Sequence, residues 1–210
     1  MRITAITKTK KGRFALFVDD EFMFSVDAET MLEHRLAAQQ ETDIQTLEQI
    51  RCSADRRYQK ERALSLLGYK SYTKQALIDR LAREGDALIA AEVADRLEEL
   101  GLIDDRSYAR RCASDLFSIK GYGARRVQYE LMRRGIPREM ADDVVSELAP
   151  EGEDTLDAIV AIIERKYARC LSDRKGIDRA VRGLARLGYD YDDIRTAIAR
   201  CSEDDEPFDG

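Results

Sequence analysis

The residues that could do chemistry in this chain include two adjacent aspartates. Asp104 and Asp105 lie in the stretch GLIDDRSYARR, residues 101–111, where a tyrosine and three arginines surround or follow them. Paired carboxylates can bind a divalent metal or act as acid and base, but both tasks need a further ligand or a second carboxylate across a cleft. The neighbouring sequence supplies neither. We therefore expect the pair to cap the helix that begins there and to oppose its dipole.

Other catalytic or cofactor-binding patterns are missing from the sequence. His34 is the single histidine, and the cysteines, at positions 52, 112, 170 and 201, stand far apart with no CxxC pair, which argues against a zinc or redox site. There is no Walker A sequence and no GxGxxG. The nearest glycine-rich stretch, KGYG at 120–123, has the wrong spacing for a phosphate loop, and we interpret it as a flexible joint between two helices. The sequence predicts no catalytic residue, no metal and no cofactor.

Composition limits the classes of protein to which this chain can belong. Charged residues make up 36% of the 210 residues and aromatic residues 7%, with three prolines, which is typical of a helix-rich protein with much solvated surface. No apolar run approaches the roughly 20 residues that span a bilayer, and the first residues lead straight into charge without a signal-peptide core. We expect a soluble, cytoplasmic monomer without membrane contact.

Two kinds of periodicity divide the chain. Residues 3–9, 14–18 and 22–26 alternate apolar and polar side chains, which predicts a small antiparallel meander, with Phe22, Phe24 and Val26 on one covered face. Helical periodicity follows. Asp27 is expected to cap a short helix to about residue 36, and Thr42 or Asp43 another to about residue 52.

From residue 54 onward a pattern recurs three times. The stretches ALIDRLAREG (76–85), RVQYELMRRG (126–135) and RAVRGLARLG (179–188) match at offsets of 50 and 53 residues. A helix is expected before each stretch, at about 54–68, 105–118 and 154–170, and another after it, at about 87–100, 138–148 and 190–200. The final glycines (Gly85, Gly135 and Gly188) should adopt the left-handed conformation that lets the chain reverse.

The predicted fold is mainly α, with tandem three-helix, helix-turn-helix-like repeats behind the N-terminal antiparallel β meander. The expected domains are the meander with short helices (1–52), the first repeat (53–104), a basic second repeat (105–150), the third repeat (151–201) and an acidic disordered tail (202–210).

Basic charge is concentrated in the second repeat. The chain carries a net charge of −6, yet residues 106–138 hold nine basic and two acidic residues, a net charge of +7, so the other 177 residues carry −13. On a helical wheel Ala124, Val127 and Leu131 face the core. The candidate partner- or DNA-binding residues are Arg106, Arg110, Arg111, Lys120, Arg125, Arg126, Tyr129, Arg133 and Arg134.

This set has the chemistry of an anion-binding surface. Guanidinium groups bind carboxylates and phosphates bidentately, and a tyrosine among them can stack. Acidic partners at i,i+4 are scarce within the segment, so we expect these cations to be available for a partner rather than paired within the chain. Basic residues recur around the middle helices of repeat one (Lys70, Lys74, Arg80 and Arg83) and repeat three (Arg174, Lys175, Arg179, Arg182 and Arg186).

Several of these blocks resemble one family. GLIDDRSYA (101–109), KGYGARRVQYELMRRGI (120–136) and LGYDYDDI (187–194) resemble the recognisable blocks of the RecX family, bacterial regulators of the RecA recombinase, and RALSLLGYKSYTKQALIDRL (62–81) is similar to the block before them. The third repeat departs from the family pattern, with Leu187 before the glycine where an arginine is usual.

The resemblance implies a non-enzymatic modulator. It implies binding to RecA, chiefly as the filament on single-stranded DNA, with inhibition of ATPase, strand-exchange and coprotease activities in recombination and DNA repair. It also implies an elongated, curved helical array lying in the filament groove. From the residues alone two other functions stay open: an autonomous module that binds the DNA phosphate backbone directly, and a scaffold that binds an unrelated acidic protein.

Overall fold

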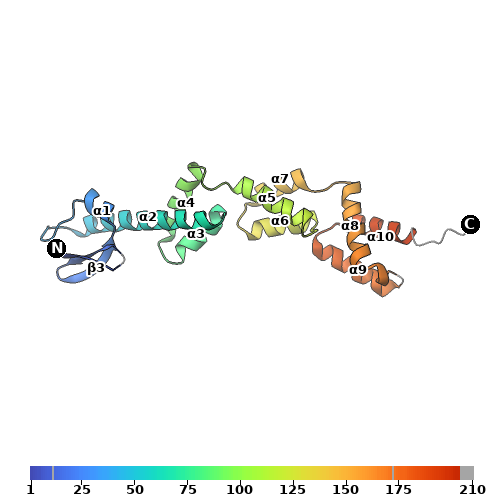
Figure 1. Cartoon of the computed structure of the whole chain (residues 1–210), viewed down its shortest axis with the longest axis horizontal. Coiled ribbons are helices and arrows are strands. Elements are labelled where there is room, and N and C mark those ends of the chain that lie inside the picture. The colour runs from blue at the N-terminus through green and yellow to red at the C-terminus, as the bar shows by residue number, and fades with distance from the viewer. Residues whose placement is uncertain (11, 172, 204–210) are drawn as a thin grey trace, which may run out of the picture. The chain divides into compact units, whose positions relative to one another are not determined.

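The fold is mainly helical with a small N-terminal sheet, as the sequence predicts. The computed structural model describes residues 1–203 apart from residues 11 and 172, and within this range it contains ten α-helices, one short 3₁₀ helix and three strands (Figure 1). Of the expected acidic tail, 202–210, the first two residues belong to the last helix and the remainder lies outside the described residues. The chain divides into two compact units, Met1–Asp104 and Asp105–Gly210.

The first unit begins with the predicted meander. Strands β1 (Ile3–Lys8), β2 (Phe14–Val18) and β3 (Glu21–Val26) form one antiparallel sheet in the order β1-β2-β3. Its covered face contributes Ile3, Leu16, Val18 and Val26 to the core, each at most 2% exposed. The alternation of apolar and polar residues in these short strands therefore indicates one buried face of the sheet.

Phe22 does not lie on that face, which corrects the sequence-based expectation. The pairing of β2 with β3 shifts from Leu16–Phe24 to Phe17–Phe22, so Met23 is an extra residue in β3. Such a bulge reverses the alternation beyond it. Phe22 is consequently 58% exposed and packs edge-on against Phe17, with ring centroids 5.9 Å apart.

Aspartates cap the first two helices. Asp27 Oδ1 accepts a 2.9 Å hydrogen bond from the amide of Thr30 at the start of α1 (Ala28–Glu33), which ends three residues earlier than expected. Asp43 Oδ1 accepts a 2.8 Å hydrogen bond from the amide of Thr46 at the start of α2 (Ile44–Tyr69). Both caps satisfy amides that have no partner inside the helix.

Helix α2 is one continuous helix of 26 residues, so the two separate helices expected on either side of residue 53 are wrong. No glycine or proline occurs between residues 44 and 67 to stop the helix. The expected boundary at 52/53 falls inside it. The first half of α2 packs Leu47, Ile50 and Ala54 against the sheet, and the second half packs Ala63 into the next cluster.

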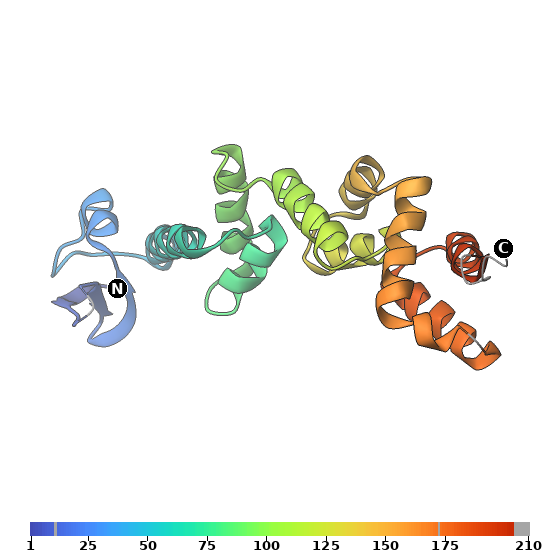
Figure 2. The ribbon, with the colours of Figure 1, turned by 45° about the vertical axis from the view of Figure 1, so that its right-hand side comes forward.

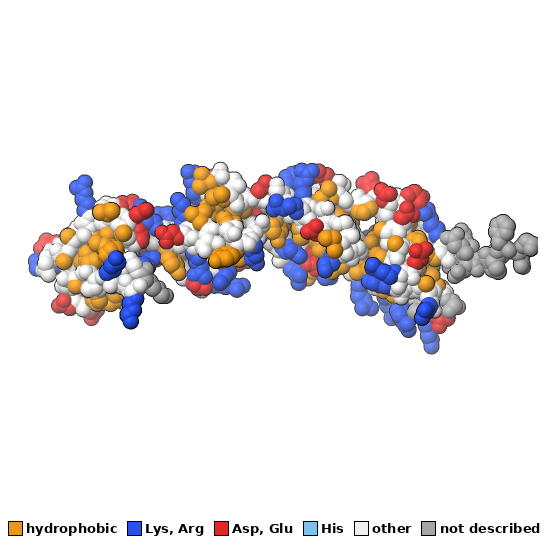
Figure 3. Space-filling model, in the orientation of Figure 1, with side chains coloured by type: hydrophobic (Ala, Val, Ile, Leu, Met, Phe, Trp, Pro, Cys, Tyr) orange, Lys and Arg blue, Asp and Glu red, His pale blue; other side chains and the backbone are white. Residues whose placement is uncertain are grey.

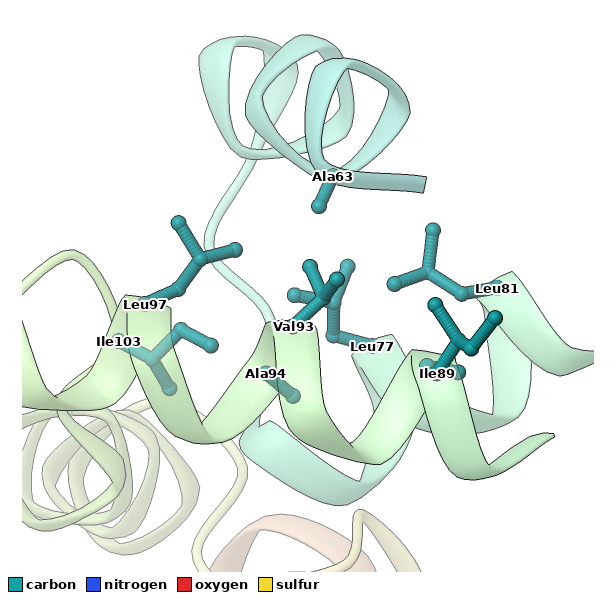
Figure 4. Close-up of a cluster of buried hydrophobic side chains, with 9 residues drawn as sticks. Ala63, Leu77, Leu81, Ile89, Val93, Ala94, Leu97 and Ile103 are labelled. Atoms are coloured by element: carbon teal, nitrogen blue, oxygen red, sulfur yellow. The ribbon is translucent and has the colours of Figure 1, made fainter. Parts of the chain in front are cut away.

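The second core of this unit lies between α2, α3 (Lys74–Ala82) and α4 (Ala87–Glu99). Figure 4 shows Leu77 and Leu81 of α3 meeting Val93 and Leu97 of α4 beneath Ala63. These side chains are at most 4% exposed. Leu77 and Leu81 stand four residues apart, so they share the buried side of α3.

Gly85 does not have the left-handed conformation that the sequence pattern predicts for it, whereas Gly135 and Gly188 do, with φ of 89° and 93°. The reason for a glycine at position 85 is space. A Cβ there would lie 2.5 Å from Nε2 of Gln59, whose amide occupies the site that a side chain would need. The glycine that ends each repeated stretch thus has two different roles: it allows close packing at position 85 and a left-handed backbone at positions 135 and 188.

The second unit opens with α5 (Asp105–Ser118), α6 (Ala124–Arg133) and α7 (Arg138–Leu148). Their shared core contains Ala109, Val127, Leu131 and Val144, all at 0% exposure. It is followed by α8 (Glu153–Lys166), a 3₁₀ turn (Ala168–Cys170), α9 (Arg174–Leu187) and α10 (Tyr191–Glu203), seen together in Figure 2. Ile159, Ile163, Leu184 and Ile194 fill their core.

The two three-helix groups of this unit meet through hydrogen bonds to backbone carbonyls. The amide of Gly123 donates a 2.8 Å hydrogen bond to the carbonyl of Leu187, and Tyr189 Oη donates a 3.2 Å hydrogen bond to the carbonyl of Gly121. A Cβ on Gly188 would lie 2.3 Å from the amide nitrogen of Arg126. The KGYG segment (120–123), which the sequence predicts to be a flexible joint, is therefore packed against the turn between α9 and α10.

Candidate functional site

The candidate surface is the outer side of α6. We call Arg125, Arg126, Tyr129 and Arg133 the α6 arginine face. The side chains of Arg125 and Arg133 are 65% and 63% exposed, and Tyr129 is 55% exposed. Ala124, expected toward the core, is exposed because it stands at the first position of the helix, before the neighbouring helices cover it.

A buried glutamate lies beneath this face. Glu130 has a side chain only 6% exposed, and its carboxylate accepts hydrogen bonds from Nη2 of Arg126 at 2.7 Å and from Nη2 of Arg133 at 2.9 Å. These partners stand four residues before and three residues after it, one turn away on either side. The expectation that the arginines would lack such a partner is wrong, because one carboxylate serves two guanidinium groups.

Other candidate arginines pair with carboxylates from outside the basic segment. Nη2 of Arg125 lies 2.5 Å from Oδ2 of Asp190, at the turn before α10. Arg110 forms an ion pair with Glu147 of α7, and Arg106 lies 4.0 Å from the same carboxylate. These pairs orient the α5 arginines toward α7. Counting acidic residues within 106–138 missed them, because the carboxylates come from neighbouring helices.

Aromatic rings accompany the α6 arginine face. The guanidinium carbon of Arg126 lies 5.3 Å from the ring centre of Tyr129 and 5.7 Å from that of Tyr122, within the range of cation–π attraction. Nη1 of Arg134 donates a 3.5 Å hydrogen bond to Tyr108 Oη, an interaction that raises the pKa of Arg134. Arg126 is therefore held between rings and Glu130.

The last two candidate residues have no such contacts. Arg111 and Lys120 are exposed, and neither forms an ion pair with any carboxylate that the structure describes. Arg111 lies in α5 and Lys120 in the turn after it. The nine candidate residues thus divide into the α6 arginine face, α5 arginines drawn toward α7, Arg134 at Tyr108, and two solvated cations.

The adjacent aspartates belong to the start of a helix. Asp104 directly precedes α5 and Asp105 is its first residue, the positions where carboxylates oppose the helix dipole. In the part of the chain that the structure describes, no three histidine, cysteine or acidic side chains gather as a metal site. Cys112 is partly buried, and desolvation raises the pKa of its thiol, which makes it a poor nucleophile.

A second cationic surface lies on α9, formed by four of the basic residues that the sequence shows in repeat three and that the candidate site does not include. Lys175, Arg179, Arg182 and Arg186 recur at i, i+4, i+7 and i+11, which places them on one side of the helix. We call these four residues the α9 ladder. Figure 3 shows Lys and Arg side chains gathered over this end of the second unit. Their spacing was the signal that could have identified them.

These features define a class of protein before any comparison. The three-helix groups carry exposed cationic faces, and a sheet that is covered on one side precedes them. The molecule therefore presents charged surfaces to which a partner can bind. No helix among the described residues has the length and apolarity needed to cross a membrane. The fold and the surfaces are those of a helical binding protein.

Comparison with known proteins agrees with this class. Residues 104–145 match the family model "RecX, second three-helix domain", and residues 1–43 match "Regulatory protein RecX N-terminal domain". A Regulatory protein RecX of Lacticaseibacillus paracasei is 29% identical over 210 residues, covering 98% of this chain and 86% of the relative. That of Halorhodospira halophila is 33% identical over 150 residues, covering 70% of this chain and 90% of the relative.

A solved structure extends the likeness to three dimensions. A crystal structure of regulatory protein RecX superposes with a TM-score of 0.68, at 20% sequence identity, covering 93% of this chain and 98% of the other. The chain belongs to the RecX family of regulatory proteins.

Proposed function

We propose that this chain binds RecA, chiefly as the filament that RecA forms on single-stranded DNA. Binding lowers the ATPase, strand-exchange and coprotease activities of the filament, and the chain itself catalyses no reaction. One observation carries the proposal: the segment that matches the RecX second three-helix domain, 104–145, also contains the +7 stretch 106–138 and exposes the α6 arginine face.

Pairing within the chain does not disable this face. An exposed ion pair contributes only about 0–1 kcal/mol, so a carboxylate of a partner can replace Asp190 on Arg125 at small cost. The side chains of Arg125 and Asp190 are 65% and 48% exposed. This exchange suits a contact that forms and dissociates during filament assembly and disassembly.

Glu130 orients the other two arginines. A guanidinium carries five N–H donors, and Glu130 engages only Nη2 of Arg126 and of Arg133. The remaining donors stay available for a carboxylate or phosphate, and side chains already held in place lose less conformational entropy on binding. Tyr129 between them supplies the aromatic contact area that protein interfaces favour.

The joint between the two groups of the second unit suits the inhibition proposed. The amide of Gly123 and the hydroxyl of Tyr189 each donate a hydrogen bond to a backbone carbonyl of the other three-helix group, and these bonds join the two groups. Two groups joined in this way and bound across neighbouring RecA protomers would restrict the motions that accompany ATP turnover. The same face could instead bind an unrelated acidic protein, and the experiment separates the two.

The test measures ATP hydrolysis by RecA on single-stranded DNA with substoichiometric amounts of this protein. We expect inhibition by the natural chain and at least about tenfold weaker inhibition by Arg125→Glu/Arg126→Glu/Arg133→Glu, because about 1.4 kcal/mol of lost contact corresponds to that factor. Lys8→Glu/Lys10→Glu/Arg51→Glu makes the same change in net charge on the first unit and should inhibit normally.

Charge reversal beside Glu130 can disturb folding, so a gentler variant accompanies it. Arg125→Ala/Tyr129→Ala leaves both ion pairs of Glu130 intact and should retain the helical circular dichroism of the natural chain. Weaker inhibition by this folded variant supports the assignment. Full inhibition by both variants would remove the α6 arginine face from the proposal, and absence of inhibition by the natural chain would remove RecA.

A further inference from the structure

A groove lies between α2 and α4 of the first unit, with a cavity volume of about 340 Å³. Two residues of α2 and four of α4 line it, namely Arg56, Lys60, Glu92, Val93, Arg96 and Leu97. We call these six residues the α2–α4 groove. It shares no residue with the α6 arginine face or the α9 ladder, and the proposed function makes no use of it.

The floor of the α2–α4 groove is apolar. Val93 and Leu97 are 4% and 1% exposed, and both side chains point from α4 toward α2, as Figure 4 shows. The walls are mainly apolar as well, because long cationic side chains lay their methylene groups along apolar surface and keep their charge in water. A ligand that enters the groove therefore meets hydrocarbon below and charge at the edge.

Positive charge predominates at the edge of the groove. The lining holds three basic residues and one acidic residue, a net charge of +2. Nε and Nη2 of Arg56 lie 3.1 Å and 2.9 Å from Oε2 of Glu92, and Nη1 of Arg96 lies 2.7 Å from Oε2 of Glu99, which is outside the lining. Lys60 is exposed and forms no ion pair with a carboxylate in the described part of the chain. This excess of cations favours a ligand that carries carboxylates.

Both ion pairs of the groove can give way to a carboxylate of a partner. The side chains of Arg56 and Glu92 are 52% and 56% exposed, and those of Arg96 and Glu99 are both 64% exposed. Solvent screens ion pairs that are this exposed, so they contribute little to stability. An incoming carboxylate can therefore bind Arg56 or Arg96 at small cost, and it can bind Lys60 without displacing another carboxylate.

The length of the groove limits the size of the group that fits. Arg56 and Lys60 stand one turn apart on α2, as do Glu92 and Arg96 on α4, so each wall extends about 6 Å along its helix. This length suits one large aromatic or aliphatic side chain rather than the full face of a helix. In an extended segment the neighbours of that side chain follow at about 3.3 Å per residue, within reach of the cations at the edge.

Two exposed leucines lie beyond the groove. Leu64 and Leu100 stand four residues after Lys60 and Arg96, on the same side of their helices. They are 41% and 51% exposed. A segment bound in the groove can cover them, which would exclude water from the edge of the contact.

A nucleic acid fits this groove poorly. A phosphate backbone would engage the cations, but it would leave Val93 and Leu97 without an apolar contact and would approach the carboxylate of Glu92. Protein interfaces, in contrast, combine a buried apolar anchor with a polar rim. The combination of an apolar floor and a cationic edge therefore favours a protein ligand.

We propose that the α2–α4 groove binds an acidic segment of a protein partner, in which carboxylates flank one large apolar side chain. The apolar side chain lies on Val93 and Leu97, and the carboxylates bind Arg56, Lys60 and Arg96. The site needs neither RecA nor DNA. It gives the first unit a binding task that is separate from that of the α6 arginine face.

The test measures binding of the full chain to a fluorescein-labelled peptide, Gly-Glu-Glu-Asp-Phe-Asp-Glu-Glu-Gly, by anisotropy in the absence of RecA and DNA. We expect a dissociation constant on the order of 100 µM, because the contact is short and has a single anchor. A peptide with serine in place of the phenylalanine should bind at least about tenfold more weakly. A peptide with glutamine and asparagine in place of the acidic residues should lose affinity by a similar factor, about tenfold.

Variants of the chain test the groove itself. Lys60→Glu/Arg96→Glu reverses two of its cations and should weaken binding of the phenylalanine peptide at least about tenfold. The matched control is Lys8→Glu/Arg51→Glu, which makes the same change in the net charge of the first unit and should bind the peptide within about twofold of the natural affinity. Arg51 stands about 180° from Lys60 around α2. All four residues are exposed, and circular dichroism checks that both variants are folded.

Three results would count against the proposal. Natural affinity in Lys60→Glu/Arg96→Glu would overturn it. Equal binding of the phenylalanine and serine peptides would do the same, since the contact would then consist of charge alone. Sedimentation velocity supplies the third: if the natural chain dimerises with rising concentration and this variant does not, the occupant of the groove is a second copy of the chain.

The groove and the proposed function can fail separately. A groove variant that has lost peptide binding but still inhibits RecA ATP hydrolysis supports a separate site and leaves the α6 arginine face as the contact with RecA. Weaker inhibition by that variant would contradict the separate task, because the groove would then belong to the RecA contact. A natural chain that binds the peptide and leaves RecA unaffected supports the groove and contradicts the proposed function.

Discussion

Glu130 orients two of the three arginines of the candidate surface. Its carboxylate is buried, while the side chains of its two partners, Arg126 and Arg133, are 39% and 63% exposed. A buried carboxylate without these partners would be costly. The exposed arginines therefore have a structural task as well as the binding task we propose, and their substitution affects both.

Glu130→Gln should lower the free energy of unfolding by about 1–2 kcal/mol, because the amide keeps the shape but loses two charge-assisted hydrogen bonds to partly solvated partners. Urea denaturation followed by circular dichroism measures the change. Glu139→Gln is the control, since Glu139 is exposed in the first turn of α7, and it should change stability by less than about 0.5 kcal/mol. Equal effects of the two variants would contradict the structural role of Glu130.

At the scale of elements, the contact between the start of α6 and the end of α9 depends on the absence of side chains. Gly188 has φ of 93°, and a Cβ there would overlap the backbone of Arg126. A Cβ added to Gly123 would lie 2.5 Å from the carbonyl of Gly188, so this position has no room for a side chain. Two glycines that the sequence suggested for turns thus also set how closely two helical groups approach.

Gly188→Ala should destabilise the chain by about 2–4 kcal/mol, the sum of a left-handed backbone cost of about 1 kcal/mol and an overlap cost of about 1–3 kcal/mol. Gly101→Ala separates the two contributions, because Gly101 has φ of 70° and a Cβ added to it would meet nothing within 4 Å. It should cost about 1 kcal/mol. Thermal unfolding of both variants provides the comparison, and similar losses would show that the close approach is unimportant.

At the scale of the whole molecule, hydrophobic cores assign residues to two units. Two clusters use described residues up to Ile103, and two use residues from Tyr108 onward. No cluster of the described residues crosses the boundary that separates the units at 104/105. Each unit contains the apolar contacts that folding requires.

Fragments 1–103 and 104–210 should therefore each fold. We expect their summed circular dichroism to reproduce that of the full chain, and each fragment to unfold cooperatively in urea. The cut keeps Asp104 with α5. Fragments 1–52 and 53–210 form the control, and they should lose helical signal because that cut interrupts α2. An unfolded 104–210 fragment would contradict the independence of the second unit.

Local patterns determined a large part of this structure. The strands, the caps at Asp27 and Asp43, and the apolar sides of α3 and α6 follow from periodicity and from short-range hydrogen bonding, which are encoded within a few residues. The same reasoning failed at residue 53 and at Phe22. In the first case no breaker separates two apparent helices, and in the second a bulge that depends on strand pairing reverses the alternation.

Tertiary structure alone decided the pairing of Arg125 and Arg110, whereas the pairs of Glu130 with Arg126 and Arg133 are local to α6. Asp190 is 65 residues from Arg125, and Glu147 is 37 residues from Arg110, so a charge count along the chain does not reveal these pairs. Composition located a basic second repeat. Folding supplies its arginines with carboxylates and leaves Lys175, Arg182 and Arg186 without ion pairs among the described residues, because electrostatic attraction depends on distance in space rather than on separation in sequence.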